Sequence, residues 1–105
     1  MTLTLKDPAL LRNQAYIDGA WCDADNGDRM PVTNPATGET IVEIARVGAA
    51  ETRRAIEAAE RAMGSWKLVP AKERAQILRR WFDLLMELQD DLGRLMTAEQ
   101  GKPLA

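Results

Sequence analysis

Hydrophobic and polar residues follow two different periods along this chain, and the change from one to the other falls at Gly48. Before Gly48, apolar and polar residues alternate in short runs, which is typical of β-strands with one covered face. After Gly48, apolar residues recur every three or four positions, which is the spacing of one face of an α-helix. Strands followed by helices indicate an α+β unit or one edge of a larger α/β domain.

Three short strands are predicted before Gly48, over residues 15–23, 30–33 and 40–47. The first contains Gly19, at which we expect a bulge or bend. Asn26-Gly27 lies in a turn over residues 25–28, since this pair tolerates the positive φ angles of tight turns. A second turn is expected over residues 34–38. The three strands should form an antiparallel meander or a pair of hairpins, preceded by a loop over residues 1–14 with a short helical turn near residues 8–11.

Two long helices and a third short one are predicted after Gly48. The first has an apolar face over residues 52–66 and should end at Gly64-Ser65. The second begins at Pro70 and has a broad apolar stripe, which includes residues 75, 77, 78, 81, 82, 84, 85 and 88. Asp90-Asp91 marks either the first turn of a third helix or a kink in the second, because carboxylates favour a helix N-terminus. Gly101 should end the last helix.

The last residues of the chain combine a helix stop with a helix start. Gly101 closes one helix, and Pro103 is suited to the first turn of another. We therefore expect residues 15–105 to be an incomplete domain, the front part of a longer protein.

Composition narrows the classes of partner. The chain has 105 residues, of which 46% are hydrophobic and 29% are charged, and its net charge is −2. These values are ordinary for a folded domain and give no electrostatic reason to bind nucleic acid or an anionic membrane. No apolar run approaches the roughly 20 residues that cross a bilayer. With one cysteine, Cys22, and no signal peptide, the expected location is the cytoplasm.

The residue types needed for most catalytic sites are missing. The chain has no histidine, which excludes His-dependent nucleophile pairs within it. Cys22 lies in a predicted strand with no basic neighbour in sequence, so we interpret it as a structural side chain. Gly101-Lys102 fails the P-loop pattern, because Met96 and Pro103 stand where a Gly and a Ser or Thr are required. No Gly-rich dinucleotide fingerprint is present. We therefore expect no catalytic and no cofactor-binding residue in this chain.

Two further groups of residues could suggest function and are better explained structurally. Glu87, Asp90 and Asp91 form a carboxylate cluster, which we expect to be hydrated on a polar helix face. The aromatic residues on the helical stripes are expected to be core residues and not base-stacking platforms; they are Trp66, Trp81 and Phe82.

Several stretches resemble the aldehyde dehydrogenase family, in that family's order and spacing. Residues 17–21 (IDGAW) are similar to its INGEW opening, and residues 32–39 (VTNPATGE) are similar to its NPATGE turn. Residues 79–85 and 95–103 resemble its second and third helices. The ending EQGKPLA is most similar to the succinate-semialdehyde dehydrogenase group and its relatives that act on glutarate semialdehyde. The resemblance covers nearly the whole chain from Ala15.

The resemblance implies a function for a longer protein. That protein would oxidise a semialdehyde, foremost succinate semialdehyde, to its acid with NAD or NADP, NADP being favoured by the resemblance. The family's catalytic cysteine forms a thioester with the substrate, and a glutamate activates the water that hydrolyses it. Those residues and the cofactor phosphate site lie beyond residue 105, and Cys22 does not match the nucleophile. This chain would be the outer part of the cofactor-binding domain, inactive alone, in an enzyme that forms a homo-oligomer. As the resemblance implies, later sequence would cover the broad apolar stripes, so the chain by itself should fold poorly or self-associate.

The resemblance also implies one structural cation site. Some family members hold a structural monovalent cation on backbone carbonyls, at positions that match Val32 or Thr33 and Glu99. No other metal site is expected.

The alternative interpretation of the whole chain is a small independent helical protein-interaction module with no catalytic activity.

Overall fold

The first two strands form a tight hairpin, and this differs from the single strand expected over residues 15–23. The computed structural model describes residues 3–104. In it β1 (Ala15–Ile17) pairs antiparallel with β2 (Ala20–Cys22). Asp18 and Gly19 have φ angles of 52° and 77°, as a two-residue type I′ turn requires. The expected bulge at Gly19 was wrong, because Asp-Gly acts here as a hairpin turn. Tyr16 and Trp21 lie opposite each other, with ring centroids 5.0 Å apart.

A second, separate hairpin follows. β3 (Arg29–Thr33) pairs antiparallel with β4 (Thr40–Ala45), with a register shift at Val32/Thr33. The expected turn over residues 34–38 is confirmed: the Asn34 side-chain oxygen accepts from the backbone N–H of Ala36, and Gly38 has a φ of 77°. The turn at Asn26-Gly27 is also present. However, it connects β2 to β3, which are not paired, so the strands form two hairpins and not a meander.

Three helices complete the chain, as the sequence predicted. α1 spans Ala49–Trp66, α2 spans Ala71–Glu87 and α3 spans Gln89–Gln100, while a short 3₁₀ turn, η1, spans Pro8–Leu10. α1 continues through Gly64-Ser65, where we expected it to end, since Gly64 keeps a helical backbone there. Asp90 and Asp91 lie in the first turn of α3, which settles the choice between a third helix and a kink. Gly101 ends α3 with a φ of 81°.

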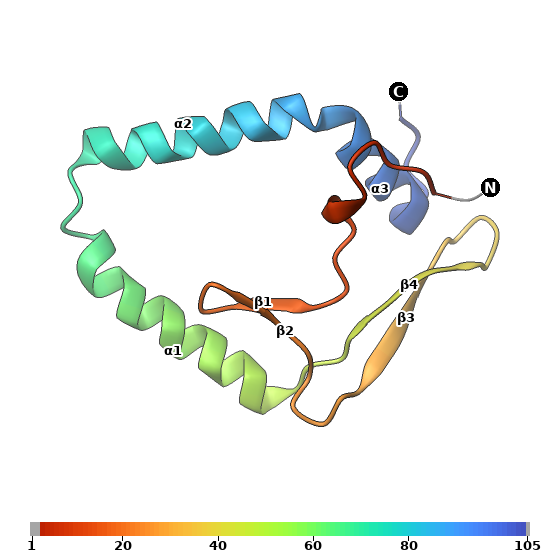
Figure 1. Cartoon of the computed structure of the whole chain (residues 1–105), viewed down its shortest axis with the longest axis horizontal. Helices are drawn as coiled ribbons and strands as arrows, with labels where there is room; N and C mark the ends of the chain where they lie inside the picture. The colour runs from red at the N-terminus through yellow and green to blue at the C-terminus, as the bar shows by residue number, and fades with distance from the viewer. Residues whose placement is uncertain (1–2, 105) are drawn as a thin grey trace.

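The elements form an open, flat arrangement with almost no core. Figure 1 shows α1 and α2 diverging from their connection, with the β1–β2 hairpin between them and α3 folded back above the β3–β4 hairpin. The radius of gyration is 16.8 Å, whereas a compact domain of this length has about 13 Å. Among the hydrophobic residues of segment 3–104, Ala24 is the one that is buried, with 5% exposure. Short antiparallel strands and then three helices therefore form a partial α/β architecture, as expected.

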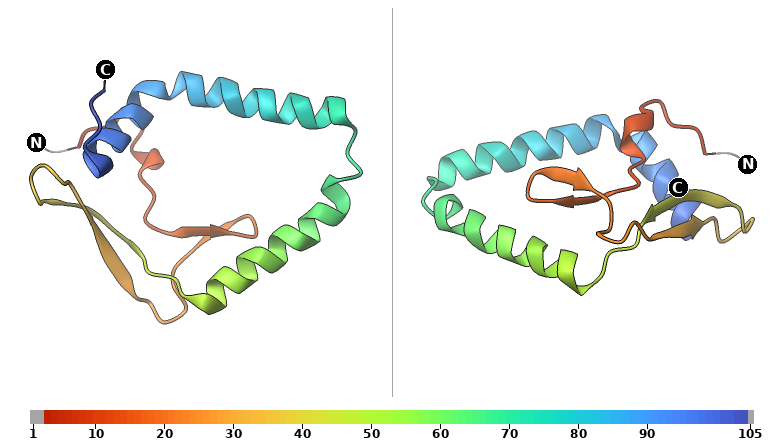
Figure 2. Two further views of the ribbon diagram at one scale, coloured as in Figure 1. Left: turned by 180° about the vertical axis from the view of Figure 1, so that it is seen from behind. Right: turned by 60° about the horizontal axis from the view of Figure 1, so that its bottom comes forward.

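Asp91 fixes the N-terminal segment to α3. Its two carboxylate oxygens accept hydrogen bonds from the backbone N–H groups of Lys6 at 3.0 Å and Asp7 at 2.9 Å. The side chain is buried, with 4% exposure, so the expectation that it would be hydrated was wrong. Glu87 and Asp90 are exposed, as predicted. The two N–H donors lower the pKa of Asp91, because they stabilise its charged form. Figure 2 shows the N-terminal segment beside α3 in both views.

Replacing Asp91 by Asn should release part of this attachment. The amide keeps one oxygen acceptor but loses the charge and the second acceptor, so one of the two backbone N–H groups loses its partner. Hydrogen–deuterium exchange measured by mass spectrometry should accelerate in residues 3–11 of the Asp91→Asn chain. Glu87→Gln is the control, since Glu87 is an exposed carboxylate near Asp91 in the sequence, and it should leave exchange unchanged. Equal exchange in both variants would contradict the role of Asp91.

The same contact should respond to acid in a defined direction. Because the pKa of Asp91 lies below its ordinary value of 3.8, the attachment contributes stability above that value and loses it as pH falls through the lowered pKa. Exchange at Lys6 and Asp7, corrected for the intrinsic rate at each pH, should stay slow from neutral pH to about pH 4 and accelerate below it. Loss of protection already near neutral pH would argue against a carboxylate as the acceptor.

Candidate functional site

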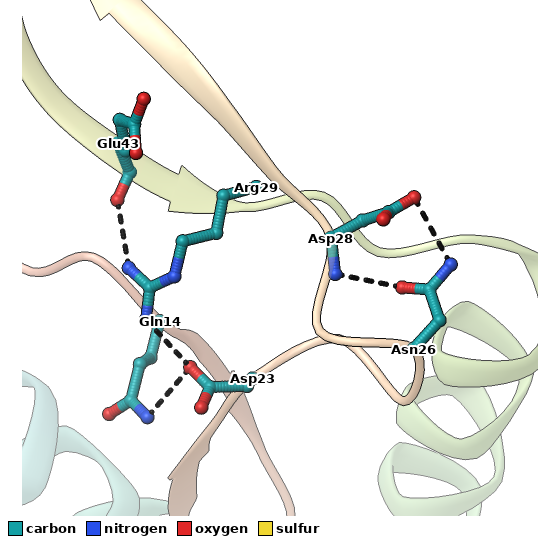
Figure 3. Close-up of polar contacts among 6 residues, drawn as sticks. All are labelled: Gln14, Asp23, Asn26, Asp28, Arg29 and Glu43. Atoms are coloured by element: carbon teal, nitrogen blue, oxygen red, sulfur yellow. Dashed lines mark hydrogen bonds and ion pairs between the residues drawn. The ribbon is translucent and has the colours of Figure 1, made fainter.

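The polar residues of the strand region hold loops together and do not form a catalytic cluster. Figure 3 shows Asp23 accepting hydrogen bonds from the Gln14 amide at 3.1 Å and the Arg29 guanidinium at 3.3 Å. Arg29 also donates to the backbone oxygen of Glu43 at 3.2 Å. One side chain, Arg29, therefore links the end of the β1–β2 hairpin to the β3–β4 hairpin. These groups are largely exposed and pair with one another, which is a structural arrangement.

The turn between the two hairpins is held by its own side chains. The oxygen of the Asn26 amide accepts from the backbone N–H of Asp28 at 2.9 Å, and its nitrogen donates to the Asp28 carboxylate at 3.1 Å (Figure 3). Asn is suited to this position because its short side chain closes such a turn on itself.

A second polar cluster attaches this turn to the start of α1. Arg54 donates two hydrogen bonds of 2.8 Å to the two carboxylate oxygens of Asp25. This bidentate contact lowers the pKa of Asp25 and raises that of Arg54. Glu51 is buried, with 5% exposure, and accepts from the backbone N–H of Asp25 at 3.2 Å. Like Asp91, Glu51 is a buried carboxylate whose partner is a backbone N–H far away in sequence. The sequence predicted neither of these two contacts.

The structure separates the residues that could have suggested catalysis. Cys22 is half-buried at the end of β2. Gly101-Lys102 forms a helix C-terminus, where the Lys102 carbonyl accepts from the Thr97 hydroxyl at 2.6 Å. In residues 3–104, no three His, Cys, Asp or Glu side chains form a metal-binding group.

The predicted cation positions lie on neighbouring elements. Val32 and Thr33 end β3, and Glu99 lies in the last turn of α3. A Cβ atom built on Gly101 would lie 3.3 Å from Cγ of Pro35, so the turn after β3 contacts the end of α3. The cation site itself stays a prediction.

The apolar sides of α1 and α2 are open to solvent. Trp66, Trp81 and Phe82 were expected to be core residues, but they are 36%, 62% and 49% exposed. The physical reason is the divergence of α1 and α2 (Figure 1), because of which the two helices do not pack along each other. Of the helices in residues 3–104, none has the length and apolar character needed to cross a membrane.

Comparisons with known proteins agree along nearly the whole chain. The aldehyde dehydrogenase family model matches residues 21–105. The chain is 65% identical over 103 residues to the glutarate-semialdehyde dehydrogenase of Pseudomonas aeruginosa, a match that covers 98% of the chain and 21% of that relative. It is 57% identical over 103 residues to the NADP(+) succinate-semialdehyde dehydrogenase GabD of Escherichia coli, with the same coverage of 98% and 21%.

Solved structures share the arrangement of the elements. A crystal structure of an E. coli NADP-dependent enzyme superposes with a TM-score of 0.94 at 57% identity, covering 96% of this chain and 21% of that one. The succinate-semialdehyde dehydrogenase of Burkholderia pseudomallei gives a TM-score of 0.93 at 55% identity, again with 96% and 21% coverage. The chain spans about a fifth of the length of these relatives. The open arrangement of its helices is therefore one that crystal structures contain, and the chain belongs to the aldehyde dehydrogenase family.

Proposed function

We propose that this chain supplies the N-terminal part of the cofactor-binding domain of an NAD(P)-dependent dehydrogenase that oxidises a semialdehyde to a carboxylic acid. The observation that carries the proposal is the uninterrupted similarity to semialdehyde dehydrogenases, at 57–65% identity over 103 residues. Succinate semialdehyde is the first candidate substrate and glutarate semialdehyde the second, since relatives named for each are among the similar proteins.

The chain's own residues have a structural role in this proposal. NAD(P)⁺ would accept the hydride of the aldehyde, and a cysteine thioester would be hydrolysed by water, but no described residue is assigned to either step. The sequence offers no Gly-rich phosphate loop, so the residues present do not fit the cofactor. What they provide is α1, held to the turn at Asp25 through Glu51 and Arg54, and α3, held to the N-terminal segment through Asp91. We expect the complete enzyme to be cytoplasmic and to form a homo-oligomer, as the family resemblance implies.

Any cation bound near this chain would also be structural. Backbone carbonyls near Val32 or Thr33 and near Glu99 would hold a monovalent ion in the complete enzyme. The contact between the turn after β3 and the end of α3 supports this proposal, because it places both segments at one corner of the fold.

A chimera tests the proposed function. Residues 1–105 should replace the matching first fifth of the E. coli succinate-semialdehyde dehydrogenase, and NADPH formation should be followed with succinate and glutarate semialdehydes. We expect the chimera to be soluble and to keep activity within about tenfold of the unmodified E. coli enzyme, because small differences in packing cost little when most buried positions are retained. The 105-residue chain alone should reduce neither NAD⁺ nor NADP⁺.

The matched control is the unmodified E. coli enzyme prepared in parallel. A chimera that is insoluble, or that is folded yet inactive, would count against the proposal. A monomeric 105-residue chain that unfolds cooperatively would instead favour the independent interaction module.

A further inference from the structure

Two turns of the strand region are closed by an asparagine side chain in the same way. The amide oxygen of Asn26 accepts from the backbone N–H of Asp28 at 2.9 Å (Figure 3). The amide oxygen of Asn34 accepts from the backbone N–H of Ala36, also at 2.9 Å. In both turns the side-chain amide is therefore folded back over the peptide bond that joins its asparagine to the next residue.

The residue after each asparagine decides whether that amide can react with the backbone. A backbone nitrogen that loses its proton can attack Cγ of the preceding asparagine and close a cyclic succinimide. Pro35 has no backbone N–H, so Asn34 cannot react in this way. Gly27 has an N–H and no side chain to hinder ring closure, and no described atom lies within 4 Å of the position that its Cβ would take. The third asparagine of the chain, Asn13, precedes Gln14, whose side chain hinders the same attack.

We propose that Asn26 is a site of spontaneous covalent modification of this chain, by deamidation. The Gly27 nitrogen forms a bond to Cγ of Asn26, the bond from Cγ to the side-chain nitrogen breaks, and that nitrogen leaves as ammonia with the proton of the Gly27 N–H. Water then opens the succinimide at either carbonyl, which gives aspartate or isoaspartate at position 26. The reaction consumes one water and needs no enzyme, oxidant or cofactor. Residues 25–28 are exposed, so water reaches this turn. The inference does not depend on the proposed function.

The turn slows this reaction while it is intact. The attacking group is engaged, because the Gly27 N–H donates to the carbonyl of Ala24 at 2.9 Å. The leaving group is engaged as well, because the amide nitrogen of Asn26 donates to the Asp28 carboxylate at 3.1 Å. Attack on Cγ requires the Gly27 N–H to leave Ala24 and the Asn26 side chain to rotate away from Asp28. Deamidation therefore follows opening of the turn.

The product cannot restore the turn in full. A carboxylate at position 26 has no proton to donate to Asp28, so two negative groups face each other in place of a hydrogen bond. Isoaspartate in addition inserts a methylene group into the backbone. The adjacent Asp25 holds Arg54 and Glu51 of α1. Modification of Asn26 therefore weakens the attachment of α1 to the strand region.

Peptide mapping by mass spectrometry tests the site. The chimera described above, which carries this chain within a complete enzyme, should be incubated in mildly alkaline buffer, both folded and in guanidinium chloride, and then digested with trypsin. Replacement of –NH2 by –OH raises the mass of peptide 13–29, and fragmentation assigns the change to Asn26 or Asn13. We expect conversion at Asn26, roughly tenfold slower in the folded chimera, because hydrogen bonds of the turn must open first. Asn13 and Asn34 are internal controls and should remain amides over the same period.

A variant separates the effect of the turn from that of the sequence. Asp28→Ala removes the acceptor of the Asn26 amide nitrogen, so the folded chimera should deamidate about two- to fivefold faster. Its rate in guanidinium chloride should stay unchanged, since no turn is present there. Glu43→Ala is the matched control, another exposed carboxylate of the strand region, and it should change neither rate.

Several outcomes would overturn the inference. Conversion at Asn13 or Asn34 that equals the conversion at Asn26 would do so, as would an Asn26 that remains an amide in guanidinium chloride. Equal rates in the folded and unfolded chimera would remove the role of the turn. If the chimera is insoluble in buffer, the sample in guanidinium chloride still decides the site. The activity of the chimera reports on the proposed function separately.

Discussion

An amphipathic helix is stable when its apolar side is covered, and in this chain that condition is met only in part. The two long helices diverge, so neither covers the other (Figure 1). Aromatic and aliphatic residues of α2 remain about half exposed, whereas the buried residues within segment 3–104 are Ala24, Glu51 and Asp91. Two of these three are carboxylates. The arrangement is therefore held by directed polar contacts, and the hydrophobic contribution to folding is largely unused in the chain by itself.

The buried carboxylates explain how so open an arrangement can have a defined geometry. A carboxylate that accepts from backbone N–H groups fixes both distance and direction, whereas apolar contact fixes neither. Asp91 connects α3 to residues 84 and 85 positions earlier, and Glu51 with Arg54 connects α1 to the turn at Asp25. These contacts attach α3 to the N-terminal segment and α1 to the turn between the two hairpins. Between them, Leu68 after α1 and Trp81 of α2 stay 77% and 62% exposed.

Local features of this fold were predictable from the sequence, and contacts between distant segments were not. Apolar periodicity predicted the helices. The end of α3 at Gly101 was predictable because glycine adopts a positive φ without strain. The hairpin at Asp18-Gly19 was missed, although Asp-Gly is a known turn signal, because three-residue strands show too little alternation to mark their ends. Asp91 could not be distinguished from Asp90 by sequence, since burial depends on which residue faces Lys6 and Asp7 after folding. Periodicity alone predicted Trp81 to be a core residue, because it identifies an apolar side but not what covers it; its exposure was implied only by the family resemblance.

The same reasoning explains why family membership is readable in a chain that carries no recognisable catalytic group. At turns, helix ends and long-range polar contacts, the backbone geometry restricts which residue types a position accepts. This chain of 105 residues has many such positions. An apolar helix side that covers other elements is constrained in a different way, by the shape and charge of what it contacts.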